Sequence, residues 1–181
     1  MTGNMISDFV KGKKKFDYPA GIQKGIALHR AIDTFTDVHE ATKEAKEIFR
    51  PAYRLYSGAF VDVVYDHFLA TDENEFSDDS LLDFSRQVYA VLESNRGWLP
   101  ARFALMFPYM RDQNWLYNYR TKWGTEKSLG GVVRRSAYLT ESNTAFSLFE
   151  QHYQLLQRCY RHFWAAVKPY ALGEMERLLP G

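Results

Sequence analysis

Apolar side chains recur every three or four residues along most of this chain, which is the period of amphipathic α-helices. No alternating strand pattern and no Asn-Gly or Asp-Gly hairpin signal competes with that period. The pattern predicts helices over about residues 3–12, 19–36, 37–51, 57–71, 79–95, 98–111, 112–122, 125–137 and 142–168. Because the sequence has no internal repeat and no linker, we expect one compact all-α domain over residues 1–181.

Short polar residues mark where two of these helices begin. Thr36 or Asp37 is the expected cap of the helix over 37–51, and Ser77 or Asp78 that of the helix over 79–95. A proline removes one backbone donor and disfavours helix interiors, so two prolines are expected to break, kink or end a helix. These prolines are Pro51 and Pro169.

Composition narrows the class of protein. Apolar residues make up 46% of the chain and the net charge is +1, which argues for a folded protein and against generic nucleic-acid binding. Cys159 is the only cysteine, so no intramolecular disulfide forms, and we expect its thiol to serve packing. No signal-peptide pattern and no apolar run of the ~20 residues needed to cross a bilayer is present, so a soluble, cytoplasmic protein is expected.

Charge is unevenly distributed along the chain. Residues 55–85 contain eight acids and no lysine or arginine, whereas residues 1–36 carry six basic residues against three acids. Candidate metal-ligating and catalytic residues lie within both stretches.

The segment "IALHRAIDTFTD" places His29, Asp33 and Asp37 at intervals of four, along one side of a helix. The segment "VDVVYDHFL" places Asp62 and Asp66 four apart on an otherwise apolar helix. Burying an ionised carboxylate is costly unless a cation or hydrogen-bond donors compensate it. The pattern therefore indicates a cation near these carboxylates.

His67, which follows Asp66, adds a second imidazole to this arrangement. Two helices that project carboxylates and imidazoles inward can build a metal centre in a helical protein. Histidine and carboxylate ligands without thiolates suit Mn²⁺, Fe²⁺ or Mg²⁺. The alternatives are solvated or capping aspartates, an Asp62–Arg30 ion pair and a His67 that belongs to the core.

Four segments in this order resemble the acyl carrier protein phosphodiesterase family: "GNMISDFVKG", "GIALHRAIDTFTD", "FVDVVYDHFLA" and "FPYMRDQNWLYNY". The resemblance implies an all-α fold distantly related to the HD-domain phosphohydrolases. It also implies a divalent metal, typically Mn²⁺, and removal of 4′-phosphopantetheine from holo-acyl carrier protein. Members of the family usually have a further apolar, histidine-containing stretch before the "GN" block, whereas this sequence begins "MTGN", so the resemblance implies an N-terminus shorter than is usual in the family.

The family's motifs imply a role for specific residues of this sequence. The expected metal ligands are Asp8, His29, Asp33, Asp66 and His67, with Asp37 as a further candidate. Asp66-His67 reverses the His-Asp order of HD domains. In the mechanism that we expect, the metal activates a water, Asp62 accepts its proton, and Arg30 stabilises the phosphoryl oxygens or forms a surface salt bridge.

The expected partner is holo-acyl carrier protein, with no nucleic acid and no membrane. Acyl carrier proteins are strongly acidic, so a basic patch would attract them. Two other functions fit the same residues: a metal phosphohydrolase that acts on nucleotides or small phosphodiesters, and an inactive helical binding module. Lysines near Asp8 and His29 in sequence offer the patch, or form a solvated loop: Lys11, Lys13, Lys14, Lys15 and Lys24.

Overall fold

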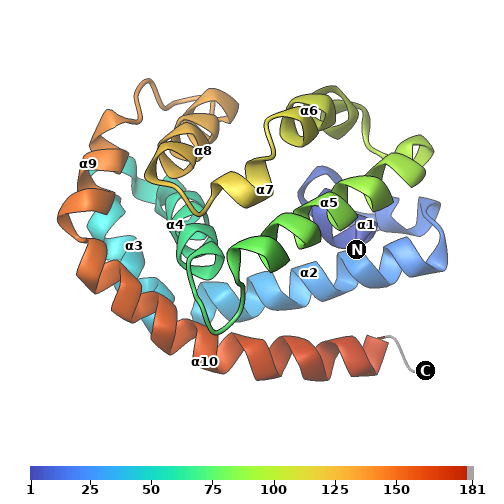
Figure 1. Cartoon of the computed structure of the whole chain (residues 1–181), viewed down its shortest axis with the longest axis horizontal. Helices are drawn as coiled ribbons and strands as arrows, with labels where there is room; N and C mark the ends of the chain where they lie inside the picture. The colour runs from blue at the N-terminus through green and yellow to red at the C-terminus, as the bar shows by residue number, and fades with distance from the viewer. Residues whose placement is uncertain (179–181) are drawn as a thin grey trace.

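Helices make up most of residues 1–178, the part of the chain that this computed structural model describes (Figure 1). The α-helices are α1 (Thr2–Ile6), α2 (Ala20–Val38), α3 (Glu40–Tyr53), α4 (Ser57–Ala70), α5 (Asp78–Ser94), α6 (Ala101–Asp112), α7 (Trp115–Asn118), α8 (Lys122–Arg135), α9 (Asn143–Gln151) and α10 (Tyr153–Leu178). Four 3₁₀ segments join them: η1 (Ser7–Phe9), η2 (Gly12–Asp17), η3 (Arg54–Tyr56) and η4 (Arg96–Trp98). No strand occurs within the described residues, which confirms the predicted all-α class. The relation to HD domains stays a prediction.

One predicted helix cap is confirmed and the other is wrong. Ser77 caps α5 as predicted: its side chain accepts from the Ser80 backbone N–H, and the Ser80 hydroxyl accepts from Ser77 in return. The predicted cap of α3 was wrong. Because α2 continues to Val38, Thr36 and Asp37 lie in its last turn, and the His39 side chain accepts the Ala41 N–H instead.

The prolines interrupt the helices less than expected. Pro51 lies inside the last turn of α3, which runs on to Tyr53. Pro169 lies inside α10, which continues to Leu178. Tertiary contact offsets the lost hydrogen bond here, because the Tyr170 ring stacks on Phe35 of α2 with 4.5 Å between ring centroids.

Three predicted helices are shorter or divided. The expected helix over residues 3–12 is α-helical only up to Ile6, continues as the 3₁₀ segment η1, and gives way to extended backbone at Val10. Between α6 and α8, the expected helix over 112–122 is reduced to Trp115–Asn118, because Asn114 adopts a left-handed conformation (φ 46°). The expected helix over 142–168 is divided into α9 and α10 at His152, whose ψ of 19° lies outside the helical range.

The apolar side chains form two cores along the length of the molecule. The first core is built by α3, α4, α8, α9 and α10, and includes the fully buried Phe49, Phe60 and Phe149. The second core is built by α1, the first half of α2, α5 and α6, and includes Ile26 and Phe107. Burying one such side chain contributes about 1.5–3 kcal/mol, so both cores matter for stability.

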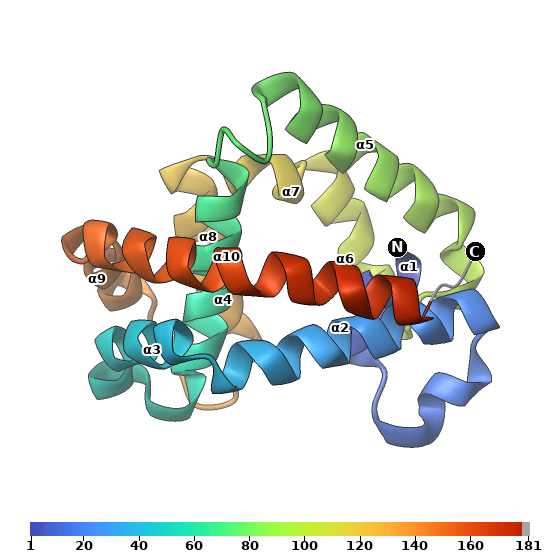
Figure 2. The same ribbon diagram turned by 90° about the horizontal axis from the view of Figure 1, so that it is seen from below.

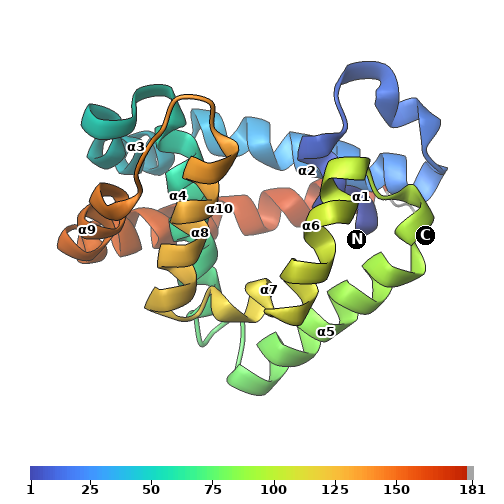
Figure 3. The same cartoon turned by 90° about the horizontal axis from the view of Figure 1, so that it is seen from above.

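Two long helices connect the cores. In Figures 1 and 2, α2 and α10 lie side by side along the longest axis, with α3, α4, α8 and α9 toward one end and α1, α5 and α6 toward the other. Viewed from above, α7 connects α6 to α8 between the two groups (Figure 3). Residues that lie between the cores can therefore come from several distant parts of the sequence.

Two remaining expectations concern Cys159 and membranes. Cys159 is buried in the first core, and burial raises the pKa of its thiol to about 11, which fits a packing residue. Within residues 1–178, no helix combines the length and the apolarity that a membrane span needs.

Candidate metal centre

The close packing of α1 on α2 brings Asp8 beside His29. At Gly3, an added Cβ would lie 2.0 Å from the Ile22 carbonyl oxygen, and at Gly25 it would lie 3.0 Å from the Asn4 nitrogen. Only glycine permits backbones to approach so closely. The chain then turns through η1, which holds Asp8 over the side of α2 that carries His29.

Asp8, His29 and Asp33 form a compact group. His29 Nε2 lies 3.1 Å from Asp8 Oδ1 and 3.2 Å from Asp33 Oδ2, the latter one turn further along α2. Hydrogen bonds to Asp33 and then Asp8 raise the pKa of His29 to about 10, so its Nε2 holds a proton between the two carboxylates. The hydrogen bond from His29 lowers the pKa of Asp8.

The donor set of this group fits a divalent cation. One ligand atom from each of the three residues lies within 4.8 Å of the others, close enough for a single ion to contact all three. Two carboxylates and an imidazole suit Mn²⁺, Fe²⁺ or Mg²⁺. Because a ligating nitrogen must be unprotonated, a metal would have to displace the proton from His29 Nε2.

Asp62 and Asp66 of α4 lie near this group but are not part of it. Both residues are exposed, yet burial is the first cause that raises the pKa of each to about 7. Both side chains therefore reach water, while the protein atoms around them still disfavour their charged forms. The charges of Asp66 and Asp33 raise the pKa of Asp62 further, so the carboxylates of α2 and α4 interact electrostatically.

His67 lies apart from these carboxylates, inside the first core. It is 2% exposed; Nδ1 lies 2.8 Å from the Tyr119 carbonyl oxygen and Nε2 lies 3.0 Å from the Tyr153 hydroxyl. Because a carbonyl oxygen can only accept, Nδ1 carries the proton and Nε2 accepts from Tyr153. Both ring nitrogens are thus occupied, and the structure does not bring His67 to the predicted metal.

Arg30 and Asp37 also have structural contacts. The Arg30 guanidinium donates to the Val10 carbonyl and so ties the chain that follows η1 to α2. The alternative Asp62–Arg30 pair is not found among the ion pairs of residues 1–178. Asp37 pairs with Lys46 of α3, with 2.8 Å between Oδ1 and Nζ, and neither caps α3 nor joins the Asp8–His29–Asp33 group.

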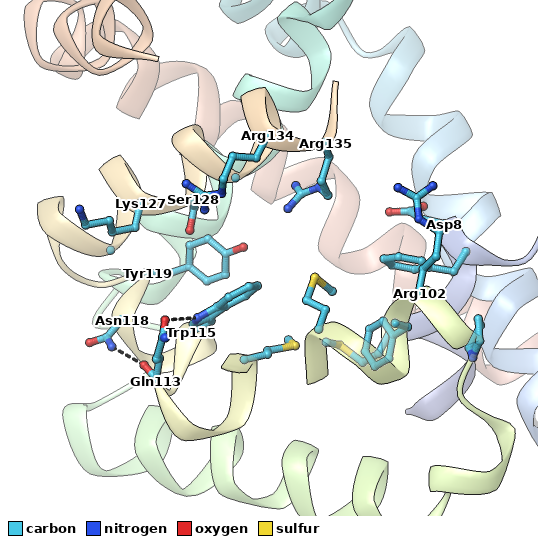
Figure 4. Close-up of a pocket in the computed structure, with 18 of the residues that line it drawn as sticks. Asp8, Arg102, Gln113, Trp115, Asn118, Tyr119, Lys127, Ser128, Arg134 and Arg135 are labelled. Carbon is cyan, nitrogen blue, oxygen red and sulfur yellow. Dashed lines mark hydrogen bonds between the residues drawn. The ribbon is translucent and has the colours of Figure 1, made fainter. Parts of the chain in front are cut away.

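A cavity of about 910 Å³ opens beside Asp8 (Figure 4). Asp8 and Arg102 lie at one side of it, and Tyr119, Arg134 and Arg135 lie at the other. Most of its large apolar lining side chains are half-buried or buried: Met5, Phe9, Phe103, Met106, Met110 and Trp115. The cavity is thus apolar inside, with charged groups around it.

Comparison with known proteins identifies the family. The family model described as acyl carrier protein phosphodiesterase matches residues 1–167, which include every residue discussed above for the metal centre and the cavity. The chain belongs to the acyl carrier protein phosphodiesterase family.

Several curated members of this family are similar over most of their length, and each is named acyl carrier protein phosphodiesterase. The protein from Klebsiella pneumoniae subsp. pneumoniae is 33% identical over 169 residues, covering 91% of this chain and 86% of the relative. The Yersinia pestis protein is 32% identical over 168 residues (92% and 87%), and the Photorhabdus laumondii protein 28% over 177 residues (97% and 87%). No solved structure matches the chain.

In this member of the acyl carrier protein phosphodiesterase family, two side chains near the carboxylates were not singled out by the sequence. The Tyr119 side chain lines the cavity and lies close enough to Asp66 to lower the pKa of that carboxyl. The charge of Arg135 contributes to the lowered pKa of Asp8. Spacing along one helix could not reveal either residue, because each lies more than one helix away in sequence. The only signal was the "NWLYNY" segment, which marks Tyr119 without assigning it a role.

Proposed function

We propose that this protein is a divalent-metal-dependent phosphodiesterase that removes 4′-phosphopantetheine from holo-acyl carrier protein. The main support for this proposal is that Asp8, His29 and Asp33 lie together beside the Asp62 and Asp66 carboxylates, at the edge of a cavity. The names of the similar proteins supply the substrate and the reaction class.

The surplus of negative charge supports a metal. The charges of Asp33, Asp37 and Asp66 raise the pKa of Asp62, whereas the charge of Lys46 lowers it. Carboxylates gathered in this way repel one another unless a cation neutralises them. We assign Asp8, His29 and Asp33 as the ligands, with Mn²⁺ the expected ion. Such an ion, when bound, would neutralise charge on the phosphate and lower the pKa of a water.

Asp62 is the proposed general base. A carboxylate whose pKa is about 7 is partly ionised near neutral pH and can accept a proton from water there. In the proposed hydrolysis, the water oxygen attacks phosphorus and the bond from phosphorus to the carrier serine oxygen breaks. The serine oxygen takes up a proton, which yields apo-carrier protein and free 4′-phosphopantetheine.

Arg135 is better placed than Arg30 to stabilise the phosphoryl oxygens. Arg135 lines the cavity and acts electrostatically on both Asp8 and Tyr119. Arg30, in contrast, is engaged with the Val10 carbonyl. A guanidinium at the cavity wall can donate two parallel hydrogen bonds to a phosphate.

The mass of a holo-acyl carrier protein tests the proposal. We expect incubation with this protein and Mn²⁺ to remove the mass of phosphopantetheine from the carrier. Asp33→Asn should lower Mn²⁺ affinity at least about 100-fold and abolish turnover, because it removes a charged ligand without changing the size of the side chain. Asp83→Asn is the matched control, since Asp83 lies exposed on α5.

Two results would contradict the proposal. One is an unchanged carrier mass with Mn²⁺, Mg²⁺ and Fe²⁺ alike. The other is hydrolysis of a panel of nucleotides by a protein that leaves the holo-carrier intact, which would favour the nucleotide phosphohydrolase instead. An Asp33→Asn variant that retains wild-type metal affinity would remove Asp33 from the ligand set.

A further inference from the structure

Exposed basic side chains surround the cavity beside Asp8. Six exposed basic residues line it, and within residues 1–178 none of them takes part in an ion pair. Asp8 is the single acid among the lining residues. We call these six the cationic rim: Lys11, Lys14, Arg102, Lys127, Arg134 and Arg135.

The rim carries more charge than the reacting group needs. A phosphodiester has one negative charge, so the phosphodiester and Asp8 together leave most of the rim unmatched. Like charges held around one opening repel one another and raise the free energy of the unbound protein. The unmatched charge therefore favours a larger anionic surface than the phosphodiester itself.

We propose that the cationic rim is the docking surface for the acidic face of the acyl carrier protein, an inference that rests on the proposed function. The rim is contributed by the chain around η2, by α6 and by α8, so it surrounds the cavity on several sides. A carrier held on the rim presents its phosphodiester at the cavity edge, where Asp8 lies.

An exposed aromatic side chain gives this surface an apolar contact. Trp123 lines the cavity and is 55% exposed, and the Lys127 ammonium lies 5.9 Å from its ring centroid. Tryptophan and arginine are both enriched in protein interfaces, and the cavity lining offers Trp123 together with three arginines.

The rim also refines the lysine patch expected from the sequence. Lys11 and Lys14 belong to the rim, whereas Lys13, Lys15 and Lys24 do not line the cavity. The Lys15 ammonium lies instead over the Phe16 ring, 5.0 Å from its centroid. Docking should therefore depend on α8 residues far away in sequence more than on Lys13.

The test compares charge reversals on and off the rim. Lys127→Glu/Arg134→Glu changes two rim residues, and Lys43→Glu/Arg161→Glu makes the same charge change on exposed positions of α3 and α10. We expect the rim variant to weaken binding of apo-acyl carrier protein about tenfold or more at low salt, with the loss shrinking at high salt. The off-rim variant and Lys13→Glu should stay within about twofold of wild type.

Two further measurements, turnover of holo-carrier protein and binding of a small ligand, separate docking of the carrier from recognition of the arm. With holo-carrier, the rim variant should raise KM and leave kcat nearly unchanged. A single Arg102→Glu variant provides a second rim substitution on a separate helix, and should shift the carrier Kd in the same direction. Free 4′-phosphopantetheine, which carries the arm and one phosphate without a carrier protein, should lose much less affinity than the carrier does.

The outcomes separate the two proposals. Equal apo-carrier binding by the rim and off-rim variants would overturn the docking surface. An equal loss of affinity for 4′-phosphopantetheine would also overturn it, because the rim would then recognise the phosphate of the arm. Binding of apo-carrier requires no hydrolysis. Rim-dependent binding by a protein that leaves holo-carrier intact would therefore contradict the proposed reaction alone.

Discussion

Residues of the same type behave differently in this protein because their surroundings differ. His29 lies between two carboxylates, which raise its pKa to about 10, whereas burial lowers the pKa of His67. Asp8 has a lowered pKa beside His29, while burial raises that of Asp62 to about 7. His29 and Asp8 thus form an ion pair, His67 is a neutral residue of the core, and Asp62 is a candidate base.

The neutral state of His67 predicts a pH dependence of stability. Its pKa is below 6.5 in the folded protein and near 6.5 in the unfolded chain, so the unfolded chain binds more protons as the pH falls below 6.5. The contribution of His67 is therefore fully present above pH 6.5 and declines below it, by at most about 1.4 kcal/mol per pH unit. Urea unfolding in EDTA at pH 7.5, 6.5 and 5.5 measures this slope.

The non-titrating His67→Gln variant is the reference for this measurement. Its free energy of unfolding should be lower at pH 7.5 but should fall less steeply toward pH 5.5 than that of wild type. Parallel curves for the two proteins would show that His67 is not held neutral. Retention of Mn²⁺ binding by the folded variant would further separate His67 from the ligands.

The sequence predicted the carboxylates better than their partners. Intervals of four along α2 and α4 identified His29, Asp33, Asp62 and Asp66, since residues so spaced share a helix face. The resemblance to the family added Asp8. The same intervals could not show that His67, directly beside Asp66, faces the opposite way into the core, because that depends on how α4 packs against α8 and α9.

At the scale of elements, the contact between α1 and α2 determines where Asp8 lies. The helix periodicity predicted both helices but not their closeness, which depends on the absence of side chains at Gly3 and Gly25. Similarly, the predicted end at Pro169 failed because packing of α10 on α2 outweighs the local cost of a proline. Local patterns specify helices, whereas their lengths and contacts depend on distant residues.

Gly25→Ala should therefore disturb the metal centre through the backbone. The new Cβ would lie 3.0 Å from the Asn4 nitrogen and the Gly3 Cα, so α1 must move away from α2 and take Asp8 with it. We expect a loss of about 1–3 kcal/mol in the free energy of unfolding, and weaker Mn²⁺ binding. Thermal unfolding and metal titration measure the two effects.

Gly21→Ala is the matched control on the same helix. No atom lies within 4 Å of the position of its Cβ, and alanine favours helix more than glycine does. This variant should gain up to about 1 kcal/mol of stability and retain wild-type metal affinity. If Gly25→Ala behaved in the same way as Gly21→Ala, the close approach of α1 and α2 would not position Asp8.

At the scale of the whole molecule, the candidate metal centre lies where the two cores meet. η1 and Asp8 adjoin the second core, α4 with Asp62 and Asp66 belongs to the first, and α2 passes along both. A bound ion at Asp8, His29 and Asp33 would therefore stabilise the contact between η1 and α2 in the folded state.

Mn²⁺ should accordingly raise the melting temperature. An ion at about 100 times its Kd contributes about 2.7 kcal/mol, which corresponds to roughly 5–10 °C for a protein of this size. EDTA should reverse the shift, and calorimetry measures it. Asp83→Asn should show the wild-type shift, whereas an equal shift in Asp33→Asn would place the ion elsewhere.

The order in which the chain enters its two cores has a consequence for synthesis. The second core uses residues 6–26 and 88–110, whereas the first combines residues 41–68 with residues 129–167. On the ribosome, α3 and α4 are therefore made well before α8, α9 and α10, which later cover their apolar faces, and in that interval these faces are open to chaperones or to other nascent chains. Asp66 meets Tyr119 only once α5, α6 and α7 have also been made, so the surroundings of this carboxylate are completed later than α4 itself.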